Sequence, residues 1–167
     1  MTSSATAPAH AVHPKSAIAI PAAVQAEHQT IHQRLVSATA ARGRTGIAAR
    51  ELAKVLHSHF VREEEIALPP LGLLAPLARG EFTPEMTSVL SMTDALRAEL
   101  PRMLEEHEGI RAATARLAEA ARLESHAEAE DLALVLAAHA RSEEELFYPA
   151  AVLVGEIVRA RAAAHAR

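Results

Sequence analysis

The chain contains one pattern twice, and this repeat limits its possible folds more than any other feature. Residues 59–69 read HFVREEEIALP and residues 139–149 read HARSEEELFYP. Both segments are H-x-x-x-E-E-E, then an apolar residue, any residue, an apolar residue and Pro. A shorter motif, E-H-x-x-I, precedes each of them, at 27–31 and at 106–110. Two motifs that recur in the same order indicate two related halves.

The histidines of these motifs keep nearly the same spacing in both halves. His59 follows His28 by 31 positions, and His139 follows His107 by 32. Residues four positions apart lie on one face of a helix, so the His and the first Glu of H-x-x-x-E point the same way. The sequence therefore predicts two pseudo-symmetric αα-hairpins, each with a His on its first helix and His-x-x-x-Glu on its second.

Breaks in the helical pattern set the expected helix ends. A first helix starts near Pro21, and ARGRTG at 41–46 interrupts it. A second runs over residues 47–68 to a Pro-Pro pair. Thr and Pro at 83–84 start a third as N-cap and first helical residue. Pro101 lies within that helix and predicts either a kink or two helices that meet there.

The C-terminal part is expected to hold one further long helix and a short one. Ser125 and Glu128 fit the S-x-x-E capping box at its start. The long helix then passes through Glu143 and ends or bends at Pro149. An apolar stretch at 150–160 predicts a short fifth helix.

Composition agrees with an all-α fold. Half of the residues are apolar but only 2% are aromatic, and no stretch alternates with strand period. We expect an antiparallel up-down four-helix bundle with short additional helices over residues 17–167, preceded by a disordered N-terminal arm at 1–16. The chain has no cysteine, which excludes disulfides and thiolate metal sites.

Charge and hydropathy narrow the partners. The net charge is -4 and no run is rich in Lys or Arg, which argues against nucleic acid. The N-terminus lacks the pattern of a secretory signal, and the apolar runs are too short to span a bilayer. We expect a cytoplasmic protein that does not bind membranes and is a monomer or a homodimer.

The polar residues within the apolar helix faces predict a metal centre. Two unpaired carboxylates in an apolar interior would be strongly unfavourable, and a bound cation removes that cost. Four imidazoles with two carboxylates exceed one tetrahedral zinc site but suit two metals, each with two His, bridged by the carboxylates. Iron, zinc, manganese and copper all accept such ligands. The predicted set is His28, His59, Glu63, His107, His139 and Glu143.

These residues resemble the hemerythrin-like (HHE cation-binding) proteins over about residues 20–155. The resemblance implies a non-haem di-iron centre inside a four-helix bundle, with the same six residues as ligands. Oxygen-carrying members have a second His on the third helix, where this chain has Arg111. They also have an Asp on the fourth helix at a longer spacing, whereas this chain has Glu143. These departures put reversible oxygen carriage in doubt. His32, four residues after His28, is either a fifth His ligand or a flanking residue.

Several neighbours have competing interpretations. Tyr148 could hydrogen-bond near the metals, but packing at a helix end is the favoured interpretation. Arg111 could pair with a buried carboxylate, but a surface position is favoured. Glu64 and Glu144 are expected to be solvated or to accept hydrogen bonds from ligands.

The function expected from this pattern is a di-iron protein that binds or reduces a small oxidant such as dioxygen, peroxide or nitric oxide. Sensing, defence and iron handling are all compatible with it, as is a peroxide-reducing, oxygen-reducing or ferroxidase-like activity. The expected cofactor is two iron ions, with zinc or manganese possible in their place. The alternative function is a non-catalytic iron- or zinc-binding module with a structural or storage role. A third possibility is a metal-free helical interaction domain.

Overall fold

The computed structural model describes residues 18–166, so the predicted disordered arm at 1–16 lies outside the described residues. All regular elements of the described part are helical, as predicted. The four long helices are α1 (Ala22–Thr39), α2 (Gly43–Ile66), α4 (Leu90–Leu123) and α5 (Ala127–Ser142). The shorter elements and the C-terminal helix are η1 (Pro69–Leu73), α3 (Leu74–Ala78), η2 (Pro84–Val89), η3 (Glu143–Phe147) and α6 (Tyr148–His165).

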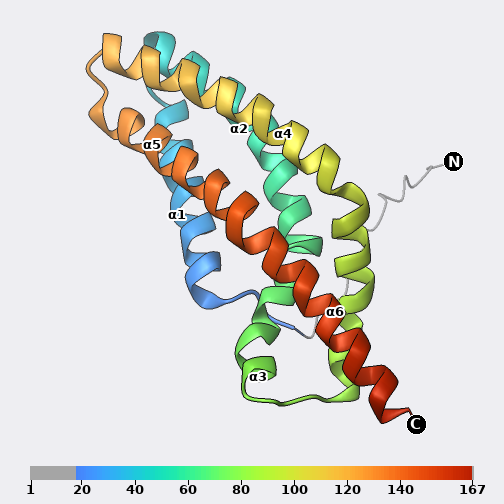
Figure 1. Ribbon diagram of the computed structural model, residues 1–167. Helices are drawn as coiled ribbons and strands as arrows, with labels where there is room; N and C mark the ends of the chain where they lie inside the picture. Colours follow the sequence, from blue (N-terminus) through green and yellow to red (C-terminus); the bar gives the residue numbers. More distant parts are fainter. Residues whose placement is uncertain (1–17, 167) are drawn as a thin grey trace, which may run out of the picture.

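The long helices run side by side with alternating direction (Figure 1). Each packs on the next along the chain, and α1 packs on α5, which closes the bundle. The predicted four-helix bundle is therefore confirmed. No helix between residues 18 and 166 is both long and apolar enough to cross a membrane.

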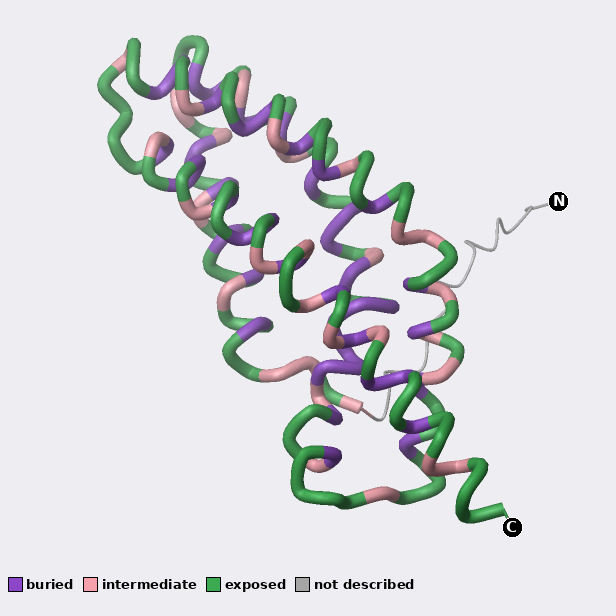
Figure 2. The backbone as a smooth tube through the Cα atoms, in the orientation of Figure 1, coloured by how far each residue is buried: buried purple, intermediate pink, exposed green. Residues whose placement is uncertain are grey.

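The bundle interior consists of two apolar clusters with a polar level between them. Buried residues follow the inner faces of the helices (Figure 2). One cluster, toward the α1–α2 and α4–α5 turns, includes Leu52, Leu117 and Leu132. The other, toward α6, includes Leu96 and Met103. The buried histidines and glutamates interrupt the apolar faces between the two clusters.

The helix α4 passes through Pro101 as one element rather than as two helices. It changes direction along its length (Figure 1). A proline inside a helix removes one hydrogen bond and displaces the preceding turn, which explains a bend without a break. Of the two predicted outcomes, the kink is the one that is seen.

The segment after Glu143 differs from the prediction that the helix ends or bends at Pro149. Residues Glu143–Phe147 form a π-helix, and the Tyr148 N–H donates to the Glu143 carbonyl. The helix then continues as α6, which is longer than the predicted 150–160 segment. Pro149 falls in the first turn of α6, where a missing N–H costs little.

The predicted capping box at Ser125 and Glu128 is wrong. The helix α5 begins at Ala127 with His126 as N-cap, and no side chain caps it. Ser125 has φ of 57°, a left-handed conformation that serves the turn instead. The neighbouring Glu124 reaches across the bundle end to cap α2.

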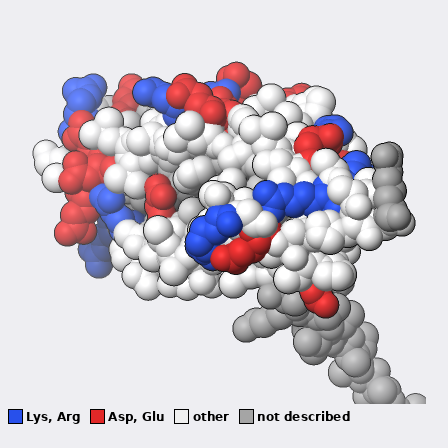
Figure 3. Space-filling view, turned by 60° about the horizontal axis from the view of Figure 1, so that its bottom comes forward, with Lys and Arg blue, Asp and Glu red and all other residues white. Residues whose placement is uncertain are grey.

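Ion pairs connect α6 to α4 outside the core. Arg97 pairs with Glu156, and Arg159 lies 2.5 Å from Asp94. On the face shown in Figure 3, positive and negative side chains are interspersed rather than gathered by sign. Such exposed pairs contribute little to stability individually.

Candidate metal centre

The six residues predicted as metal ligands come together at the polar level of the bundle. His28 lies on α1, His107 on α4, and His139 on α5. His59 and Glu63 share one face of α2. Glu143 is the first residue of the π-helix η3, one turn after His139. All six side chains are at most 2% exposed.

These side chains form two groups that share both carboxylates. One group is His28 and His139 with Glu63 and Glu143, and it is called here the α1–α5 half. The other is His59 and His107 with the same glutamates, the α2–α4 half. Within each group the ligand atoms lie within 4.8 Å of one another. Each half therefore offers two imidazole nitrogens and two carboxylate oxygens.

Each carboxylate turns one oxygen toward each half. Glu143 Oε1 lies 2.7 Å from His139 Nε2 and 3.5 Å from His28 Nε2. Its other oxygen, Oε2, lies 3.5 Å from His107 Nε2. Glu63 Oε2 lies 3.9 Å from His28 Nε2, while Oε1 lies 3.3 Å from His59 Nε2. This is the arrangement expected of carboxylates that bridge two cations.

Four atoms of the α1–α5 half are buried without a hydrogen-bond partner among the described residues. They are His28 Nε2, His139 Nε2, Glu63 Oε2 and Glu143 Oε1. The short distance between His139 and Glu143 does not have hydrogen-bond geometry. Buried polar atoms without partners are costly, and a cation would satisfy all four together. The donors present therefore fit a metal ion.

A second layer of glutamates holds the opposite nitrogen of every imidazole. The Nδ1 atoms lie 3.1 Å from Glu27 for His139 and 2.9 Å from Glu106 for His59. Such carboxylate–imidazole pairs fix the ring orientation and leave Nε2 free for a metal. The remaining two pairs join His28 to Glu64 at 3.4 Å and His107 to Glu144 at 2.7 Å.

The sequence predicts only two of these four glutamates as hydrogen-bond acceptors. Glu64 and Glu144 were predicted as solvated residues or acceptors, and they accept. Glu27 and Glu106 were missed, although each is the Glu of an E-H-x-x-I motif. The repeat of that Glu directly before the His was the available signal.

The buried charges shift one another's pKa in the metal-free protein. Burial opposes protonation of His59, but Glu63, Glu106 and Glu143 outweigh it and raise its pKa to about 9. Burial and the charge of Glu143 raise the pKa of Glu63. Burial would also raise the pKa of Glu143, but the imidazoles of His107, His139 and His28 keep it well below its ordinary value.

Tyr148 is part of the centre, contrary to the favoured interpretation of a packing aromatic. Its side chain is 1% exposed, and its hydroxyl donates to Glu63 Oε1. The hydroxyl also lies 3.2 Å from His107 Nε2 and 3.5 Å from His59 Nε2. Burial, followed by the charges of Glu63 and Glu143, raises the pKa of this phenol, so it is a hydrogen-bond donor at neutral pH.

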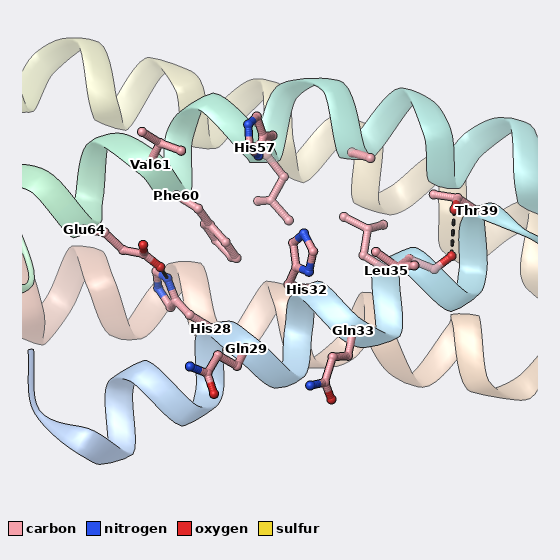
Figure 4. Close-up of a pocket in the computed structure, with 13 residues that line it drawn as sticks. His28, Gln29, His32, Gln33, Leu35, Thr39, His57, Phe60, Val61 and Glu64 are labelled. Atoms are coloured by element: carbon pink, nitrogen blue, oxygen red, sulfur yellow. Dashed lines mark hydrogen bonds and ion pairs between the residues drawn. The ribbon is translucent and has the colours of Figure 1, made fainter. Parts of the chain in front are cut away.

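His32 is not brought to the cluster. Its side chain is exposed and lines a groove of about 530 Å³ between α1 and α2 (Figure 4). Phe60 lies between this groove and the centre, with its ring stacked on His28 at 4.2 Å. Neither of the two groups of potential ligands contains His32.

Arg111 combines the two predicted interpretations. It is partly exposed, and its guanidinium lies 2.6 Å from Glu144 Oε1, the same oxygen that faces His107 Nδ1. The second-layer carboxylate of His107 is thus itself held by a cation. Arg111 reaches the centre only through Glu144.

A comparison with protein families matches the chain to the hemerythrin HHE cation-binding domain over residues 19–151. This match covers most of the chain. The chain belongs to the hemerythrin HHE cation-binding domain family. Comparisons with curated proteins and with solved structures gave no match. Cation binding in this family agrees with the buried His and Glu cluster, and the expected resemblance is confirmed.

Proposed function

We propose that this hemerythrin-like protein holds two iron ions and binds or reduces a small oxidant such as dioxygen, peroxide or nitric oxide. The observation that supports it best is the placement of Glu63 and Glu143, each with one oxygen toward each pair of histidines. In the proposed centre both carboxylates would help to hold both ions. Each half of the centre then takes one histidine from each of the two hairpins that the repeat predicts.

The proposed ligand set has six members and leaves room on each ion. His28 and His139 would hold one ion, and His59 and His107 would hold the other. Two imidazoles and two carboxylate oxygens do not fill the six positions that iron commonly takes. His32 is outside the set because it lies in the α1–α2 groove. Iron supplies the electron transfer, and the chain supplies binding, orientation and an apolar surround.

The space beside the centre favours a small ligand. A void of about 10 Å³ touches His59, His107, His139 and Glu143, and apolar residues form the rest of its wall. That volume is about what one water-sized molecule requires. An organic substrate would not fit without a large rearrangement. The wall includes Leu56, Phe60, Ile110, Leu136 and Ala140.

The chain's own groups prepare the centre before any oxidant arrives. Glu27, Glu64, Glu106 and Glu144 hold the rings through Nδ1, so each Nε2 faces inward. The two apolar clusters exclude water above and below the polar level. Tyr148 places a proton donor beside the α2–α4 half. A cytoplasmic location and a monomer or homodimer stay predictions from the sequence.

Metal analysis of protein produced with iron tests the proposal. We expect about two irons per chain and near-ultraviolet absorption bands that change when peroxide or oxygen is added. His59→Ala should lower the iron content, and His57→Ala is the matched control because His57 is exposed and lies two positions away. Colourless zinc-loaded protein that is inert to peroxide would support a structural metal module instead.

A further inference from the structure

The two halves of the centre differ at one pair of repeat-related positions. Leu68 follows Glu63 by five positions, as Tyr148 follows Glu143. The Leu68 N–H donates to the Glu63 carbonyl at 2.9 Å, and the Tyr148 N–H donates to the Glu143 carbonyl. Both side chains are buried in the same apolar cluster. The backbone thus places the two residues alike, and only one of them carries a hydroxyl.

That hydroxyl faces one half only. It contacts Glu63 Oε1, His59 Nε2 and His107 Nε2, which are three of the four potential metal-binding atoms of the α2–α4 half. The donor atoms of the α1–α5 half are left without hydrogen-bond partners among the described residues. The aromatic ring that packs on the α1–α5 half is that of Phe60, whose side chain has no polar atom.

This contrast gives the two halves different costs of metal binding. An ion that enters the α1–α5 half loses no hydrogen bond and satisfies four buried atoms that lack partners. An ion that enters the α2–α4 half must displace the Tyr148 hydroxyl from the atoms that bind it. It must also replace the hydrogen bond between His59 Nε2 and His107 Nε2, which lie 2.8 Å apart. The displaced hydroxyl also lies in a buried site, where losing a partner is unfavourable.

We propose that Tyr148 makes the two metal positions unequal, so that the α1–α5 half binds its ion first and more tightly. The α2–α4 half binds second and exchanges its ion more easily. Tyr148 is in this sense a positioning residue that acts through Glu63 and the two histidines. This inference rests on the proposed two-metal centre.

Stepwise titration of the metal-free protein with Zn²⁺ against a competing chelator tests the inference without any oxidant. For the unaltered protein we expect two binding steps of different affinity. Tyr148→Phe removes only the hydroxyl and should tighten the weaker step roughly tenfold, the size typical of contacts just outside the ligands. The tighter step should change less than about twofold, because Tyr148 does not touch that half.

Two variants assign the binding steps, and a control variant and an altered tyrosine test the assignment. His28→Ala should abolish the tighter step, and His107→Ala the weaker one. Thr114→Val is the matched control, because it also removes a buried hydroxyl and neither group of potential ligands contains Thr114. It should leave both binding steps unchanged. Because Tyr148 is the only tyrosine, biosynthetic replacement by fluorotyrosine changes this position alone. Its more acidic phenol should weaken the second step further.

Other outcomes overturn the inference. Two equal steps in the unaltered protein, or equal changes of both steps in Tyr148→Phe, would show that the hydroxyl does not distinguish the halves. An intense visible band of the iron-loaded protein that Tyr148→Phe removes would make Tyr148 a ligand instead. Failure to bind two ions at all would reject the proposed function itself, which is a different result.

Discussion

The two halves of the chain share one motif but continue differently after it. In the first half the helix α2 ends at Ile66, and a 3₁₀ segment follows. In the second half the chain stays helical through η3 and α6. Two consecutive prolines, Pro69 and Pro70, remove two N–H donors after the first motif. A single proline, Pro149, follows the second, in the first turn of α6, and the chain stays helical through it.

This comparison separates what the repeat determines from what it leaves open. The repeat determines the donors, because His and Glu recur at the same helical spacing. It does not determine what surrounds them, since Leu68 and Phe60 in the first half correspond to Tyr148 and Ala140 in the second. A centre with symmetric ligands can therefore have unequal surroundings.

Replacing a carboxylate that both halves of the metal centre share should have the largest effect on metal content, because both halves should lose their ions. Glu143→Gln exchanges one metal-facing oxygen for an amide and removes the charge that both halves use. We expect the metal content to fall from about two ions per chain to near zero, because anionic oxygen is what these cations require. Metal analysis after dialysis measures it, with circular dichroism to confirm helical folding.

His32→Ala serves as the control for Glu143→Gln. It alters an exposed residue of the same groove that His28 lines, and it should keep both ions. If Glu143→Gln kept two ions per chain while remaining folded, the bridging role would be wrong.

The second-layer glutamates should affect one half each. Glu106→Gln weakens the hold on His59 in the α2–α4 half, and Glu27→Gln weakens the hold on His139 in the α1–α5 half. Each substitution should lower the affinity of its own metal step by about 10–100-fold. Titration with a competing chelator distinguishes the two. Equal weakening of both steps by either variant would contradict a local role.

Changing the pH should separate the metal-free protein from the loaded one. The pKa of His59 rises from 6.5 to about 9 on folding, so its contribution to stability is full below pH 6.5 and is lost as the pH rises through about 9. The raised pKa of Glu63 acts in the same direction. The loaded protein needs His59 unprotonated and should not lose stability there. Melting curves with and without chelator should diverge from pH 6.5 to 9; a constant gap would contradict this.

The sequence was sufficient to predict the four-helix bundle because apolar residues recur with helical spacing and clear loop segments separate the helices. The sequence also predicts that six polar residues lie at one level of the bundle. His28 and His107 lie on the apolar faces of their helices, and H-x-x-x-E spans one turn. The contacts of Glu27 and Glu106 were not predictable in this way. These two glutamates lie beside the apolar faces of their helices. Their histidine partners are on other helices, so the contacts form only when the bundle packs.

Tyr148 shows a second reason for an incomplete prediction. In an α-helix a residue five positions after Glu143 points about 140° away from it. The π-helix bonds each N–H to the carbonyl five positions back, which brings Tyr148 onto the side of Glu143. A local change of helix type, absent from the periodicity of the sequence, therefore placed the hydroxyl.

The smallest expected effect concerns the starts of α2 and α5. These helix starts differ between the two halves of the chain, as do the segments that follow the two motifs. Glu124 accepts hydrogen bonds from the N–H groups of Arg44 and Thr45 at the start of α2 and from the Thr45 hydroxyl, while no side chain caps α5. These donors lower the pKa of Glu124 to about 2, so its contribution is present above its ordinary pKa of 4.5 and is lost as the pH falls through about 2. Glu124→Gln keeps the shape of the cap but loses the charge that favours a helix N-terminus. It should lower the melting temperature slightly at pH 7, lose that difference at pH 2, and leave both metal steps unchanged. Glu128→Gln removes a charge from the first turn of α5 but no cap, so it should lower the melting temperature less. An equal effect of the two substitutions would mean that α2 and α5 start with equal support, and the difference between the two halves would then be confined to the metal centre and the segments that follow it.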